Sequence, residues 1–167
     1  MTELDQVWSQ MLDAAASKAR ETGRHDVAEY LRLKATNDAI RKLGCSWLFN
    51  TFVEIATNIQ SSRIQLAIER REPHSFAHGS SNMVGSRINV QQGVRCLSIE
   101  AGWVRTPSDG IMRNGALAFA LITHFGIPNA GAELRLVHAE SLPQWITEDG
   151  VIVDSAYLGR HFELLLA

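Results

Sequence analysis

This chain of 167 residues has little of what marks a secreted protein. It holds only 2 cysteines, too few for the disulfide framework on which small secreted domains depend. It begins MTELDQVW, with acids where a signal peptide needs bases and no apolar stretch behind them. These absences predict a reducing, cytoplasmic setting in which the cysteines stay reduced.

Long apolar runs and excess positive charge are also lacking. The longest apolar run, residues 116–122, is far shorter than the ~20 residues that cross a bilayer, so we expect no membrane association. The net charge of −2 at pH 7 does not predict the basic surface that nucleic acid requires. No phosphate-loop, dinucleotide, nucleophile-elbow or zinc-protease motif occurs. We therefore expect no cofactor and no metal.

Lysine is scarce and unevenly placed. Lys18, Lys34 and Lys42 all precede position 63, and the nine basic residues that follow are all arginine. Arginine binds carboxylates and phosphates bidentately, which lysine cannot do. Two interpretations stay open: codon bias of a GC-rich genome, or selection of some arginines for an anionic ligand.

Size and composition indicate one globular domain over residues 1–167. A chain of this length buries roughly 70% of its unfolded surface, and the 46% hydrophobic content is ordinary for a globular protein. The pattern divides it into a helical layer, residues 1–62, and an antiparallel sheet, residues 63–167. The fold class is therefore α+β.

Three helices are predicted in the helical layer. The first begins at a cap on Thr2 and ends at Gly23, and the second runs from Asp26 to a stop at Gly44. The third starts at Ser46 and is apolar nearly all round, which predicts burial against the sheet. A helix-turn-helix DNA reader is not favoured, because the most apolar helix would have to enter the groove.

Alternating large and small residues predict the strands. The centre is a hairpin of residues 94–105 and 115–125, with a loop between them that contains Pro107 and Gly110. Residues 115–125 also fit a helix with Asn114 as its cap and Gly126 as its stop, so both interpretations stay open. Residues 63–70, 84–91, 132–139 and 151–153 complete a five- or six-stranded meander-like sheet, and the helices pack on one face. Residues 63–70 also fit a continuation of the third helix, so both interpretations of that segment stay open.

Two further segments are ambiguous. Residues 156–166 fit either a helix capped by Asp154 or Ser155, or a strand. His74 and His78 have an i, i+4 spacing, but Pro73 and Gly79 bracket them and predict a loop. Two histidines without a third ligand nearby are a weak zinc signal.

The non-core face of the sheet is the candidate binding surface. Strand parity places Arg87, Glu100, His124 and Arg135 on this face, among small residues such as Ala118. The face can be solvated, as is usual for antiparallel sheets, covered by a helix or second subunit, or shaped into a groove where an arginine holds an anionic group.

Two functions follow as hypotheses. The leading one is a non-enzymatic binding module for a small molecule, such as an anionic ligand, or for a protein partner, with a homodimer as one form of that partnership. The alternative is a small hydrolase or isomerase in which Glu100 and His124 act as an acid–base pair, because general acid–base work needs two titratable groups within hydrogen-bonding reach.

Overall fold

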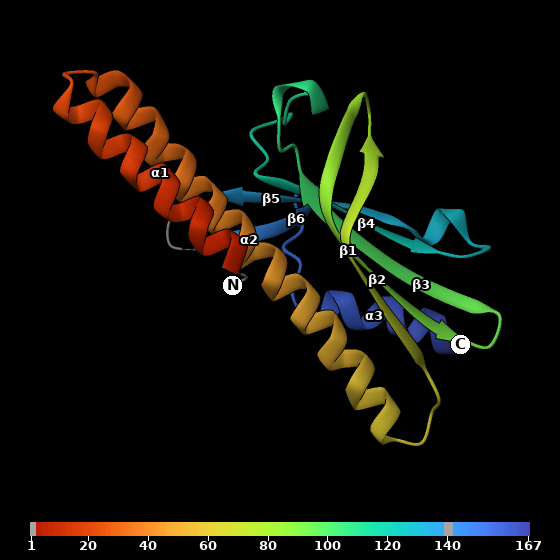
Figure 1. The fold of residues 1–167 in the computed structure, drawn as a ribbon. Helices are drawn as coiled ribbons and strands as arrows, with labels where there is room; N and C mark the ends of the chain where they lie inside the picture. The colour runs from red at the N-terminus through yellow and green to blue at the C-terminus, as the bar shows by residue number, and fades with distance from the viewer. Residues whose placement is uncertain (1–2, 139–141) are drawn as a thin grey trace. The chain divides into compact units, whose positions relative to one another are not determined.

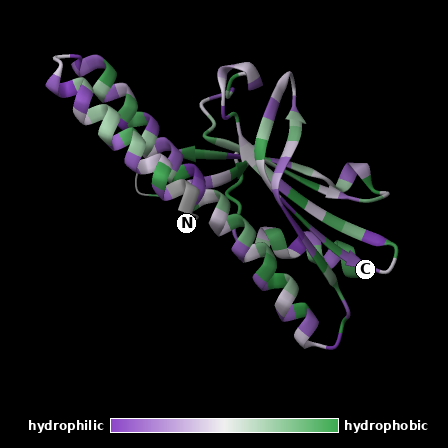
Figure 2. Ribbon diagram, viewed as in Figure 1, coloured by the Kyte–Doolittle hydropathy of each residue, from purple (hydrophilic) through white to green (hydrophobic). Residues whose placement is uncertain are grey.

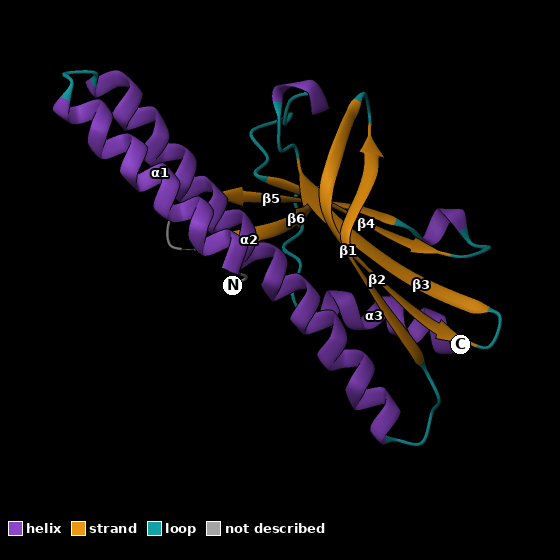
Figure 3. Ribbon diagram, in the orientation of Figure 1, coloured by secondary structure: helices purple, strands orange, loops and turns teal. Residues whose placement is uncertain are grey.

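A computed structural model describes residues 3–138 and 142–167 of the chain. It contains helices and a six-stranded antiparallel sheet, which confirms the α+β class (Figures 1 and 3). Two single-turn 3-10 helices, η1 (Pro107–Asp109) and η2 (Pro128–Ala130), lie in loops. The main elements are α1 (Glu3–Glu21), α2 (His25–Ser61), β1 (Ala67–His78), β2 (Ser81–Gln92), β3 (Arg95–Trp103), β4 (Ala118–His124), β5 (Ala132–His138), β6 (Pro143–Thr147) and α3 (Ser155–Leu166).

The chain divides into two compact units, Met1–Lys42 and Leu43–Ala167. The boundary between these units lies within α2. The first unit holds α1 and the beginning of α2, joined by a turn in which Gly23 has a φ of 78°. Hydrophobic and hydrophilic residues are interleaved along both helices (Figure 2). None of the described helices is long and apolar enough to cross a membrane.

The N-terminal segment forms two helices instead of the three predicted, and the third helix of the chain is the C-terminal α3. The predicted stop at Gly44 is wrong, because α2 runs through it without a break. A Cβ at Gly44 would lie 2.6 Å from Leu136 Cδ2, and the Gly44 carbonyl accepts a hydrogen bond of 2.8 Å from Trp145 Nε1. This glycine brings α2 close to the sheet.

The six strands follow one another in the order β1-β2-β3-β4-β5-β6, and every neighbouring pair is antiparallel. The meander predicted from the short turns is confirmed. Residues 118–124 form a strand, which decides against the helical interpretation of that region. Ser155–Leu166 is helical, and Asp154 caps it by accepting from the Tyr157 amide at 2.8 Å.

The strand boundaries differ from the prediction mainly at the two edges. β1 extends to His78, across residues that we expected to form a loop, with a register irregularity between Arg71 and His74. β6 lies at residues 143–147, before the predicted strand at residues 151–153. Within that predicted strand, Ile152 makes an isolated bridge to Ile146. Residue 139, the predicted end of β5, and the predicted cap Thr2 lie outside the described residues.

Helices pack on one face of the sheet within the second unit. This first face carries Ile99 of β3, Ala120 of β4 and Leu134 of β5, all fully buried. Ala120 lies directly opposite Leu134, and Ile99 lies one row along the neighbouring strand. Phe52 of α2 and Phe162 of α3 meet above it with ring centroids 4.7 Å apart. Small alanine side chains on β4 let these helices approach closely.

The close approach at Gly44 can be tested by adding one methyl group. Leu136 is fully buried, so its side chain has little room to yield, and Gly44→Ala should lower the free energy of unfolding by about 1–3 kcal/mol. The measurement is urea-induced unfolding.

Gly159→Ala in α3 is the matched control. Nothing lies within 4 Å of a Cβ at this position, so alanine should stabilise the protein by about 0.5–1 kcal/mol through helix propensity. Equal stabilisation by both substitutions would contradict the packing role of Gly44.

Candidate functional site

The sheet curls so strongly that its first and fifth strands touch. His78, the last residue of β1, lies 2.9 Å from Glu133 of β5, measured from Nε2 to Oε1. In a flat sheet the four steps between these strands would separate their backbones by ~19 Å. The His78 ring also stacks on Phe119 of β4, with centroids 4.0 Å apart. The end of β1 therefore lies over the second face of the sheet, the face away from the helices.

Two glycines explain why the sheet can curl here. Gly85 of β2 and Gly102 of β3 lie directly opposite each other. A Cβ on Gly85 would come 1.9 Å from the Ala101 carbonyl oxygen, and one on Gly102 would come 2.5 Å from the Val84 carbonyl oxygen. The two backbones approach more closely than any residue with a side chain allows, and glycine at such a point permits a sharp bend in a strand.

The curl encloses a second, smaller hydrophobic cluster. Phe76, Met83, Ala116 and Phe119 are its buried members, and Val104, Met112 and Leu121 pack against it. The second face is therefore not a uniformly solvated outer surface. It has an apolar floor under the folded-over end of β1.

Two histidine–carboxylate pairs flank Phe76 of this cluster. His74 Nε2 lies 2.7 Å from Glu100 Oε2, and both side chains are 17% exposed. Four residues further along β1, His78 pairs with Glu133. Each pair orients an imidazole through one ring nitrogen, which is how a carboxylate prepares a histidine for proton transfer or for ligand binding.

The hairpin between β1 and β2 is fastened to the loop that follows β3. Ser81 Oγ donates to the Ile111 carbonyl at 3.1 Å, and Arg113 donates to Ser80 Oγ at 3.0 Å. In the same loop Asp109 accepts from the Thr106 hydroxyl at 2.9 Å, and this hydrogen bond lowers the pKa of the Asp109 carboxyl. These contacts hold the end of β1 in its place over the second face.

Arg135 is a polar residue of this face whose side chain has no hydrogen-bond or ion-pair partner among the described residues. It lies directly opposite Phe119 on β4, and Phe119 lies opposite Gly102 on β3, so these residues share a face. Its side chain is partly buried, its Nε is fully buried, and it makes no hydrogen bond or ion pair to any described residue. A buried donor without an acceptor costs about 1–3 kcal/mol.

Arg87 shares this face, but its guanidinium, unlike that of Arg135, donates hydrogen bonds to Asn89 and Ser98. Its Nε donates to Asn89 Oδ1 at 2.9 Å, and Ser98 Oγ donates to the same oxygen at 2.7 Å. Arg87 lies directly opposite Glu100 on β3. It therefore contributes to a fixed polar network beside the apolar floor and has less freedom than Arg135 to bind a ligand.

His124 is on the other face of the sheet. It lies opposite Leu97, whereas Glu100 lies opposite Leu121, and residues an odd number of positions apart on a strand point to opposite faces. The predicted acid–base pair of Glu100 and His124 is therefore not formed. The large side chains of β4, Phe119 and Leu121, point into the second cluster. The alanines of β4 and His124 face the helices instead. This is the reverse of the side-chain parity that we expected for this strand.

His124 has a partner of its own on α3. Its Nε2 lies 2.9 Å from His161 Nδ1, and the rings are stacked with centroids 5.2 Å apart. Burial lowers the pKa of both imidazoles, and in His161, where the proximity of His124 adds to the effect, it lowers the pKa to about 4. The pair is therefore neutral at pH 7 and connects α3 to β4.

The sequence-predicted residues thus divide between the two faces. Arg87, Glu100 and Arg135 share the second face, and His124 does not. Sequence reasoning missed the contribution of His74 and His78 to this face. The alternation of His74, Phe76 and His78 with the exposed Ser75 and Ala77 is typical of a strand and could have indicated it. Pro73 and Gly79, which bracket these residues, favoured the prediction of a loop instead.

Among the described residues no group of three or more His, Cys, Asp or Glu side chains is arranged to hold a metal ion. The chain matches no family model, no curated protein and no solved structure in the comparisons made with it. The geometry of the second face is therefore the basis on which we infer a function.

The neutral histidine pair predicts a pH dependence of stability. Each imidazole has a pKa below its unfolded value of 6.5, so the folded state binds fewer protons than the unfolded state. The stabilisation is present above pH 6.5 and is lost as the pH falls toward about 4. Chemical unfolding over this window should show a loss on the order of 1–2 kcal/mol from the pair.

His161→Gln removes the more strongly shifted imidazole and should flatten this part of the pH profile. His138→Gln, a change at an exposed histidine, is the control and should leave the profile unchanged. If His161→Gln follows the same pH dependence as the unchanged protein, the two rings do not titrate as a neutral pair.

Proposed function

We propose that this protein binds a small anionic molecule with an apolar part on the second face of its sheet. The single observation that carries the proposal is Arg135, a partly buried arginine whose side chain makes no hydrogen bond or ion pair to any described residue. Buried polar groups in native proteins are nearly always paired, and an exception calls for an explanation such as an absent ion. A bound carboxylate would satisfy the guanidinium bidentately.

The surroundings of Arg135 support a ligand that also has an apolar part. Phe119 lies directly opposite it and is 2% exposed, and Leu121 packs against the same cluster. Glu133, two residues from Arg135 on the same face, is already paired with His78. An apolar floor with a few polar groups beside it is the usual composition of a small-molecule site.

Benzoate is a simple probe of this site, because it joins a carboxylate to an aromatic ring. Titration into ¹⁵N-labelled protein should shift one arginine Nε–Hε signal saturably. Arg135→Met should weaken the affinity at least about tenfold, since a hydrogen bond to a charged group contributes about 1.5–3 kcal/mol.

Arg160→Met is the matched control, because Arg160 lies on α3 and is exposed. It should leave the benzoate affinity unchanged. The proposal fails if both variants bind benzoate alike, or if no Nε–Hε signal moves up to the solubility limit of the probe.

Acid–base catalysis on such a ligand is the second candidate. The observation that favours it is the 2.7 Å contact of His74 with Glu100, on the same face as Arg135 and with both partners largely buried. A carboxylate held at one imidazole nitrogen leaves the other to accept a proton from a bound molecule. This pair replaces the predicted pair of Glu100 and His124.

Deuterium exchange at C3 of phenylpyruvate tests this second candidate. The probe has a carboxylate for Arg135 and a carbon-bound proton that an imidazole can remove. The protein should raise the exchange rate in D₂O above that of buffer, and His74→Gln should lose most of the increase, because general-base catalysis contributes about 10²–10⁴-fold. Equal rates for both proteins would eliminate this candidate.

A further inference from the structure

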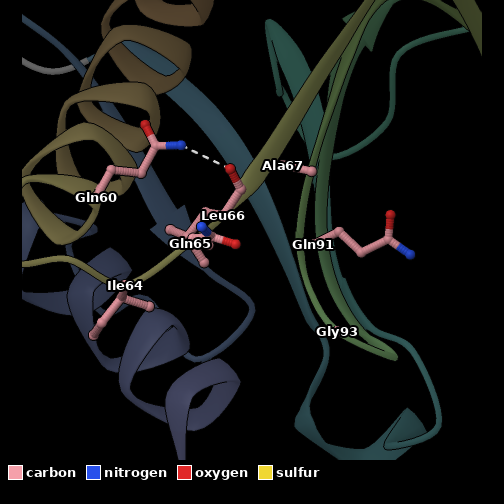
Figure 4. A pocket seen from close by; sticks show the side chains of 7 residues that line it. All are labelled: Gln60, Ile64, Gln65, Leu66, Ala67, Gln91 and Gly93. Atoms are coloured by element: carbon pink, nitrogen blue, oxygen red, sulfur yellow. Dashed lines mark hydrogen bonds between the residues drawn. The ribbon is translucent and has the colours of Figure 1, made fainter.

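A pocket of about 510 Å³ lies away from Arg135, where α2 ends and β1 begins. Gln60 at the end of α2, the connecting residues Ile64 and Gln65, and Leu66 line one part of it (Figure 4). Ala67, Gln91 and Gly93 complete the lining from β1 and the β2–β3 hairpin. Its volume is within the range of roughly 300–1,000 Å³ that is typical of small-molecule sites.

The chemistry of this pocket differs from that of the Arg135 site. None of its seven lining residues is ionisable, so a charged ligand would find no counter-charge to offset its loss of water. Three of them are glutamines, and each carboxamide offers both donors and an acceptor. Ile64 and Leu66 add apolar surface.

Two of the glutamines have hydrogen-bonding capacity to spare. Gln60 Nε2 donates to the Leu66 carbonyl at 2.7 Å, which fixes its amide and leaves Oε1 without a donor among the described residues (Figure 4). The Gln65 side chain makes no hydrogen bond to any described residue. Gln91 lines the pocket from β2, and its amide extends away from α2 (Figure 4). Gln60 and Gln65 together offer an oriented acceptor and a complete amide.

We propose that this pocket is a second binding site, whose ligand is an uncharged molecule with an amide-type donor and acceptor beside an apolar part. The N–H of such a ligand would donate to Gln60 Oε1, and its carbonyl would accept from Gln65 Nε2. Ile64 and Leu66 would contact the apolar part. The proposal is independent of the anionic site, because the two share no residue.

Benzamide and benzoate differ only in the group that distinguishes the two sites, so they form a matched pair of probes. In ¹⁵N-labelled protein, benzamide should shift the side-chain NH₂ signals of Gln60 and Gln65 saturably, and benzoate should not. Gln65→Leu should weaken benzamide binding by about 2–10-fold, the effect of one hydrogen bond.

Gln144→Leu on β6 is the control for removing a glutamine elsewhere and should leave benzamide binding unchanged. Gln65 is exposed, so Gln65→Glu, which keeps an acceptor and removes the donor, is a second variant that should fold and should also bind benzamide more weakly. Equal shifts with benzamide and benzoate, or benzamide binding that neither Gln65 variant changes, would overturn the proposal.

Discussion

The close contact of two backbones at Gly85 and Gly102 is the constraint on which the second face depends. Neither position has room for a Cβ, because each would meet a carbonyl oxygen of the neighbouring strand. Here the sheet bends, and β1 comes to lie over β4 and β5 instead of extending beyond them. The contact of His78 with Glu133 and its stacking on Phe119 follow from this bend.

The curl gives the two faces different roles. The first face packs against helices through small alanines such as Ala120 and through buried aliphatic residues such as Ile99 and Ile122, which lie opposite each other. The second face closes partly on itself around Phe76, Met83 and Phe119. Its polar groups therefore lie beside an apolar floor, where hydrogen bonds and charges interact more strongly than in water. In this setting the Nε of Arg135, which has no hydrogen-bond partner among the described residues, also lacks the water that would satisfy it on an open surface.

The two proposed sites differ in the charge of the residues around them. Arg135 lies on a face that carries histidines, carboxylates and a second arginine, whereas the pocket beside Gln60 has no ionisable residue. A ligand that suits one is penalised at the other, because an anion needs a counter-charge and a neutral amide gains little from one. The two proposals therefore call for different ligands, and both sites lie within the unit that spans residues 43–167.

The sequence alone determined the α+β class and the antiparallel order of the strands. It left open whether residues 156–166 form a strand or a helix capped by Asp154 or Ser155, and the structure decided for the helix capped by Asp154. The sequence also determined that Arg87, Glu100 and Arg135 share a face, because side-chain parity along β2, β3 and β5 follows directly from alternation. Alternation within a strand and the turn residues between strands are local, so a short window of residues contains the information that predicts them.

Tertiary structure decided the rest. From the sequence Gly44 is expected to stop the helix, but Leu136 and Trp145 pack against it and α2 continues. His124 is expected beside Glu100, but the register of β3 with β4 places the two side chains on opposite faces. His74 and His78 reached the second face only because β1 folds over strands distant in the chain. The packing at Gly44 and the partners of the three histidines depend on contacts between residues far apart in sequence, which no local pattern records.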